Sequence, residues 1–182
     1  VHSKVLETIA AKSSVIPEEY SKWNAEKKVE FLSNNANVLG EEIFTDAIVL
    51  DTVKSIKAIK NIQLYNGVNG CNRYIISQCN SALNVMEVFG LFTICGWGKR
   101  NMDIDIIPLF ETVDDLQRSA YIMKTLYENE AYSNHLQHRN HKQTIMLGFS
   151  DGTKDGGYMM ANWSIYKAKE ELTAISKSYN ID

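Results

Sequence analysis

The sequence is poor in the residues that break or cross-link a chain. Among its 182 residues there are two prolines, Pro17 and Pro108, and three cysteines. Scarce proline favours long helices and strands. The cysteines form no CxxC pair and no metal-ligand spacing, so we expect no disulfide framework and predict a reducing, cytoplasmic location. They are Cys71, Cys79 and Cys95.

Features that direct a protein to nucleic acid or to lipid are also missing. The formal net charge is -3 and no basic stretch stands out, which gives no electrostatic reason to expect nucleic acid. No apolar run approaches the roughly 20 residues that a membrane-spanning helix needs. We therefore predict neither nucleic acid nor a membrane among the partners, and a chain long enough to bury a core.

Residues 1–70 are predicted to form a helical segment. Asn24 is a suitable N-cap for a helix that runs to Leu32. A second, longer helix is expected from about Glu42 to Lys60, because apolar residues recur there at helical spacing. Its expected buried stripe is Val49, Val53, Ile56 and Ile59.

Residues 71–182 change to a strand followed by a helix, three times. The predicted strands span 74–76, 104–110 and 144–149. They are mostly continuous apolar runs, which is typical of parallel strands covered on both faces. Each is followed by enough chain for a right-handed helical crossover. The fold class is therefore predicted as α/β and α-rich, either part of a barrel or part of an open doubly wound sheet.

The three helices of this region also carry local signals. The first is expected over about 81–92. The second should begin after Thr112, with Asp115 placed as the partner of a capping box. The third shows apolar residues at alternating steps of four and three, which is a strong helical periodicity. These residues are Ala161, Ile165, Ala168, Leu172, Ile175 and Tyr179.

Polar residues follow the predicted strands where functional residues of parallel α/β proteins collect. Ser77 comes after the first strand, Glu111 after the second and Asp151 after the third. Two carboxylates at neighbouring strand ends can share Mg²⁺ or Mn²⁺, which prefer oxygen ligands. Lys154, three residues past Asp151, can meet an anionic substrate or transfer a proton.

Simpler interpretations of the same residues stay open. Glu111 and Asp151 can serve as caps of the helices that follow them, because acidic residues favour helix N-termini. Lys154 can be an ordinary solvated surface lysine. Histidines at 135, 138 and 141 are spaced by three, but no complete ligand set follows them, so we do not predict a zinc site.

Two long segments resemble phosphoenolpyruvate carboxylase. They are residues 108–116, PLFETVDDL, and residues 146–158, MLGFSDGTKDGGY, and they occur in the order that the family has them. The resemblance continues through 162–168 and upstream at 74–77. It covers most of the chain and is strongest from 73 to about 179.

The resemblance implies a carbon–carbon lyase that carboxylates phosphoenolpyruvate with bicarbonate to oxaloacetate and phosphate. This is anaplerotic carbon dioxide fixation that feeds the tricarboxylic acid cycle. Glu111 and Asp151 match the family's ligands for Mg²⁺ or Mn²⁺, and Lys154 matches an active-site lysine that helps the carboxylation. The implied fold is a partial (β/α)₈ TIM-type barrel, and the implied parent is a homotetramer.

The chain departs from the family in length. The family's upstream catalytic histidine and its downstream glycine- and arginine-rich phosphate loop have no counterpart in residues 1–182. We therefore expect an internal fragment without activity of its own. Gln78 stands where the family usually has an apolar residue, often methionine. The alternatives are another metal-dependent barrel enzyme acting on pyruvate or phosphoenolpyruvate, and a non-catalytic binding or regulatory module that retains the fold.

Overall fold

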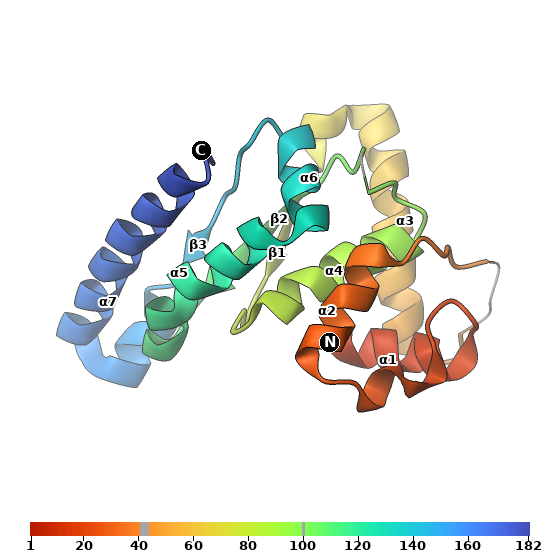
Figure 1. Ribbon diagram of the computed structural model, residues 1–182, viewed down its shortest axis with the longest axis horizontal. Helices are drawn as coiled ribbons and strands as arrows, with labels where there is room; N and C mark the ends of the chain where they lie inside the picture. Colours follow the sequence, from red (N-terminus) through yellow and green to blue (C-terminus); the bar gives the residue numbers. More distant parts are fainter. Residues whose placement is uncertain (41–43, 100) are drawn as a thin grey trace. The chain divides into compact units, whose positions relative to one another are not determined.

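The computed structural model describes residues 1–40, 44–99 and 101–182. Its contacts divide the chain into two compact units, residues 1–72 with 86–104 and residues 73–85 with 105–182. The elements are shown in Figure 1. In chain order they are α1 (His2–Lys12), η1 (Glu18–Lys22), α2 (Ala25–Asn34), α3 (Ala47–Asn66), η2 (Val68–Gly70), β1 (Arg73–Ile76), α4 (Ala82–Ile94), β2 (Asp105–Phe110), α5 (Val113–Glu128), α6 (Glu130–His138), β3 (Met146–Leu147) and α7 (Ser150–Ser178).

The first unit is helical, as the sequence predicts. The Asn24 side chain accepts a hydrogen bond from the Lys27 N–H at 2.9 Å and caps α2. Helix α3 begins at Ala47, where Asp46 is the N-cap, and the predicted start near Glu42 lies outside the described residues. The predicted stripe of α3 is buried and confirmed, with Val49, Val53, Ile56 and Ile59 between 1% and 9% exposed.

The second unit contains a small parallel sheet in the order β1-β2-β3. Arg73 pairs with Asp105 at one end of the sheet, and Leu109 pairs with Met146 at the other. This arrangement agrees with the predicted α/β class. Among the described strands, the expected cover on both faces holds for β2 alone. Arg73 and Ile75 of β1 and Met146 of β3 are exposed.

The third predicted strand, 144–149, is too long, since β3 spans Met146–Leu147. A side chain replaces the missing part of the ladder. The Gln143 amide group donates a hydrogen bond to the Ile106 carbonyl of β2 at 3.1 Å and another to the Thr144 carbonyl at 2.7 Å. The β2 carbonyl that a longer β3 would have reached is therefore already satisfied.

Helices α5 and α7 run side by side in the second unit (Figure 1). Thr112 caps α5 with the predicted capping box, in which Thr112 and Asp115 exchange hydrogen bonds. Helix α7 contains a kink at Gly157, whose φ of 78° and ψ of 167° are not helical. After the kink, the predicted face of α7 is buried at Ala161, Ala168 and Leu172.

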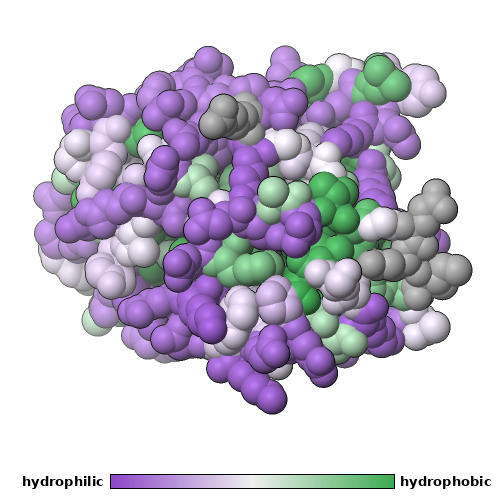
Figure 2. Space-filling model, turned by 45° about the vertical axis from the view of Figure 1, so that its right-hand side comes forward, coloured by the Kyte–Doolittle hydropathy of each residue, from purple (hydrophilic) through white to green (hydrophobic). Residues whose placement is uncertain are grey.

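The viewed surface in Figure 2 is mostly hydrophilic, and the largest of its green areas of apolar residues lies right of the centre. Both units expose some large apolar side chains, such as Leu64 and Tyr65 of α3 and Met159 and Trp163 of α7. Across the residues that the structure describes, no helix combines the length and the apolar character required to cross a membrane.

Candidate functional site

Glu111 follows β2 directly and turns toward the end of β1. Its Oε2 atom accepts a hydrogen bond from the backbone N–H of Gln78 at 2.8 Å, in the turn after β1. The cap of α5 is the next residue, Thr112, whose hydroxyl accepts the Asp115 N–H at 3.1 Å. Glu111 is therefore not the N-cap, which removes the capping interpretation for this carboxylate.

The loop after β3 lies directly against Glu111. The Gly148 N–H donates to the Phe110 carbonyl at 2.7 Å, at the end of β2. A Cβ at position 148 would lie 3.1 Å from the Glu111 Cα and 3.3 Å from its Cγ. Glycine lets two backbones approach this closely because it has no Cβ. A Cβ at Gly152 would lie 3.4 Å from the Glu111 carbonyl oxygen, so the contact continues into α7.

Asp151 lies in the first turn of α7 and pairs with Lys154. The Lys154 Nζ donates to the Asp151 Oδ1 at 2.8 Å. The N-cap position of α7 is Phe149, so Asp151 is not the N-cap either. Both side chains are at least half exposed, and water screens such a pair, so it adds little stability.

The pairing favours the charged form of Lys154. The hydrogen bond to Asp151, followed by the attraction between the two charges, raises the pKa of the Lys154 ammonium above its ordinary value. Lys154 is therefore a cation at neutral pH in this arrangement. It can attract an anion to the site, and it can donate protons in hydrogen bonds, but it is not prepared to act as a base.

These contacts bring the predicted site residues to one edge of the sheet. Gly152, the neighbour of Asp151, lies on the backbone of Glu111, and Asp155 accepts the Val113 N–H at 3.4 Å. Ser77 follows β1 at the same edge and is exposed. The segment that begins α7 therefore covers the segment that begins α5, and Glu111 and Asp151 come from these two segments.

Glu111 and Asp151 offer oxygen donors of the kind that a hard divalent cation prefers. Glu111 and Asp151 each use one carboxylate oxygen in the contacts above, and each has a second oxygen. In residues 1–40, 44–99 and 101–182, no three His, Cys, Asp or Glu side chains form a group that could hold a metal ion. Mg²⁺ fits such a sparse set, because it is usually held by one or two carboxylates together with water and substrate oxygens.

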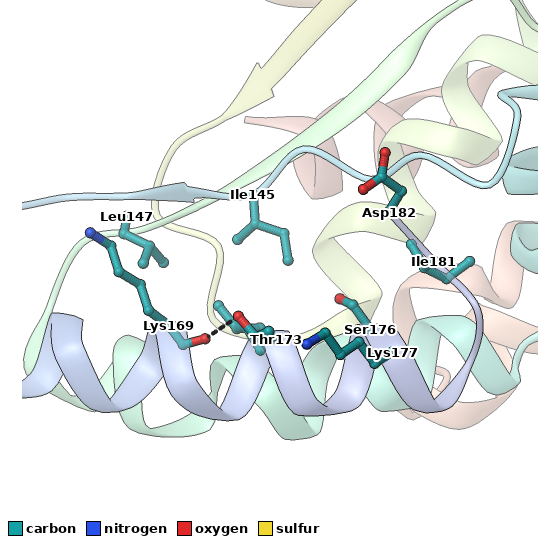
Figure 3. A pocket seen from close by; sticks show the side chains of 9 residues that line it. Ile145, Leu147, Lys169, Thr173, Ser176, Lys177, Ile181 and Asp182 are labelled. Carbon is teal, nitrogen blue, oxygen red and sulfur yellow. Dashed lines mark hydrogen bonds between the residues drawn. The ribbon is translucent and has the colours of Figure 1, made fainter.

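A cavity of about 570 Å³ lies elsewhere in the second unit, between β3 and the C-terminal half of α7. Ile145 and Leu147 face Thr173 and Ser176 across it, with Lys169 on the same helix (Figure 3). None of the three predicted site residues lines this cavity. We therefore place the candidate site at the strand ends and not in this cavity.

Sequence reasoning missed two parts of this site. It treated Gln78 as a departure in a turn, whereas the Gln78 N–H binds Glu111. It included Gly148 only as part of the matched segment 146–158, whereas Gly148 admits the Glu111 backbone. Neither contact has a local signal, because each depends on which strands are neighbours.

Parallel strands that each lead into a helix, with acidic residues at their carboxyl ends, define an α/β protein with a candidate cation site. The chain matches the phosphoenolpyruvate carboxylase family over residues 1–182, and it belongs to this family. The resemblance seen in the sequence is thereby confirmed.

Individual relatives agree with this assignment. The chain is 30% identical over 189 residues to the phosphoenolpyruvate carboxylase of Corynebacterium diphtheriae, an alignment that covers 98% of the chain and 20% of the relative. It is 29% identical over 217 residues to that of Trichormus variabilis, covering 100% of the chain and 21% of the relative. The chain thus spans about a fifth of the length of these curated relatives.

Proposed function

We propose that this chain supplies the acidic metal-binding part of a phosphoenolpyruvate carboxylase. The full-length enzyme adds bicarbonate to phosphoenolpyruvate and releases oxaloacetate and phosphate, a carbon-fixing reaction that replenishes the tricarboxylic acid cycle in the cytoplasm. Glu111 and Asp151 hold Mg²⁺ or Mn²⁺, and Lys154 is the catalytic residue beside them. Family membership supports the proposal, and so do the contacts of Gly148 and Gly152, which precede and follow Asp151 in the chain, with the Glu111 backbone.

One observation carries the assignment of the site. A Cβ on Gly148 would lie 3.1 Å from the Glu111 Cα, so the loop that leads to Asp151 is in direct contact with the residue that ends β2. A bound Mg²⁺ or Mn²⁺ supplies positive charge that stabilises developing anions. Glu111 and Asp151 provide its oxygen ligands, while Lys154 adds a positive charge that favours approach of the anionic substrates.

The proposal includes the fold of the larger protein. We propose that β1, β2 and β3 are three consecutive strands of a (β/α)₈ barrel in a homotetrameric enzyme. A right-handed crossover through α7 leads to the free edge of β3, where the next parallel strand would pair. That strand and its helix would cover the cavity between β3 and α7 (Figure 3).

The test is phosphate release by the full-length protein with phosphoenolpyruvate, bicarbonate and Mn²⁺. Asp151→Asn keeps the size of the side chain and removes its charge, so we expect kcat/KM to fall by about 100-fold or more. Asp114→Asn is the matched control, because Asp114 is an exposed aspartate in the first turn of α5. It should leave the rate unchanged.

Other results would contradict specific parts of the proposal. A folded wild-type protein without activity would favour a binding or regulatory module that retains the fold. If Asp151→Asn remains active, the proposed reaction is supported, but Asp151 is not an essential metal ligand.

A further inference from the structure

Gln78 has a backbone conformation that its residue type does not favour. Its φ is 52°, in the left-handed region. In the described residues the other non-glycine positions with positive φ are Asn140, His141 and Asn180. These three follow helices α6 and α7, and asparagine and histidine are the residue types enriched in this region. Gln78 follows a strand and belongs to neither type.

The residues that follow Gln78 fix the turn in place. The Cys79 N–H donates to the Leu109 carbonyl of β2 at 3.3 Å, and Cys79 is buried. Further along the turn, the Asn84 Oδ1 atom accepts the N–H groups of Asn80 at 3.1 Å and Ser81 at 3.2 Å. An unfavourable backbone conformation persists only where neighbouring contacts determine it, and such positions cluster at functional sites.

The left-handed turn directs the Gln78 N–H at the Glu111 carboxylate. The nitrogen lies 2.8 Å from Oε2, a distance typical of a charge-assisted hydrogen bond to a carboxylate. The Gln78 side chain is exposed, so the backbone makes this contact. On its other side, the Glu111 backbone is packed against Gly148. Glu111 is thus oriented by the turn after β1 and by the loop after β3.

We propose that Gln78 is a positioning residue of the metal site, which holds Glu111 through its backbone N–H in the left-handed conformation. Occupying one oxygen with a fixed donor leaves the second oxygen in a defined direction for the cation. The inference rests on the proposed function in so far as Glu111 is a metal ligand. The contact between Gln78 and Glu111 is independent of that role.

The first test measures the dissociation constant of Mn²⁺ for the full-length protein by electron paramagnetic resonance. Gln78→Val keeps the N–H but strongly disfavours positive φ, so we expect binding to weaken by about 10-fold or more. Gln78→Gly and Gln78→Asn accept positive φ and should bind Mn²⁺ as wild type does. Loss of binding in the glycine or asparagine variant, or wild-type binding in the valine variant, overturns the proposal.

The second test separates this proposal from the proposed function. Hydrogen exchange of the peptide spanning residues 74–80 is compared, without metal, between wild type and Glu111→Ala. Faster exchange in the variant supports the contact, and unchanged exchange overturns it. Glu111→Ala can also speed up exchange while leaving the affinity for Mn²⁺ unchanged. In that case Glu111 is not a metal ligand, and the proposal that Gln78 positions a metal ligand is wrong as well.

Discussion

Glu87 is a carboxyl group in the interior of the first unit, with 2% of its surface exposed. Burial raises the pKa of Glu87 above its ordinary value. A hydrogen bond from the Ser3 hydroxyl at 2.7 Å and the charge of Lys28 oppose this change, but burial outweighs them. The interior therefore favours the protonated form of Glu87.

Stability should consequently depend on pH through this residue. Above about pH 4.3 the unfolded chain releases the Glu87 proton, whereas the folded protein retains it to a higher pH. The folded state thus loses stability as pH rises through that window. Glu87→Gln removes this loss, so its free energy of unfolding relative to wild type should increase from pH 4 to pH 7.

Urea denaturation at several pH values measures this effect. Glu30→Gln, an exposed change on α2, is the control and should show no such trend. A Glu87→Gln variant whose difference from wild type is constant across the range would contradict the prediction.

The residues of the site divide into those that pattern alone identified and those that it did not. Glu111 and Asp151 were predicted as site residues because each follows an apolar strand in the sequence. The contact of Gln78 with Glu111 was not predicted. It joins residues 33 positions apart, and it depends on a backbone conformation that no residue pattern indicates. Side-chain type is local information, whereas backbone direction in a turn depends on neighbouring strands.

At the scale of elements, the start of α5 shows how much a short motif can determine. Thr112 and Asp115 form the capping box that their spacing of three predicts. We expect Thr112→Ala to lower the free energy of unfolding by about 1 kcal/mol, because the Asp115 N–H loses its acceptor.

Thr112→Ser is the matched control, since serine retains the hydroxyl, and it should remain within about 0.5 kcal/mol of wild type. Chemical denaturation of the three proteins measures the difference. Equal stability of the alanine variant and wild type would mean that packing of α5, and not the cap, determines where the helix begins.

Strand β3 shows the opposite case. Residues 144–149 have the apolar character of a strand, yet β3 spans Met146–Leu147. The Gln143 side chain, bonded to the Ile106 carbonyl and to the Tyr132 hydroxyl, occupies the place of the expected pairing. The sequence predicts helices better than the length of a strand. The hydrogen bonds of a helix join residues of the same segment, whereas those of a strand depend on a neighbouring strand.

For the whole molecule, we expect residues 1–182 alone to show no carboxylase activity. The chain spans about a fifth of the length of its relatives, and within the part of the chain that the structure describes no three His, Cys, Asp or Glu side chains form a group that could hold a metal ion. The measurement is phosphate release from phosphoenolpyruvate by the isolated chain, beside a Glu111→Ala variant, with circular dichroism to establish that both are helical. Turnover above that of the variant would overturn this expectation.

The division of the chain belongs to the same scale. The sequence suggested a helical segment over 1–70 followed by βα units over 71–182, and that division stays a prediction. In the structure, residues 86–104 join the first compact unit although they follow β1 in sequence. A change in the residue pattern indicates where the chain changes from helices to strands followed by helices. Which segments form one compact unit depends instead on which surfaces are buried against each other.

The sequence by itself determined the family, the main helices with their caps, the α/β class and the acidic residues at the strand ends. These depend on residues within a few positions of each other or on an extended run of matching residues. Only the tertiary structure decided the length of β3, the grouping of residues 86–104 and the meeting of Gln78, Glu111 and Gly148. Those features arise from hydrogen bonds and close backbone contacts between segments that are far apart along the chain.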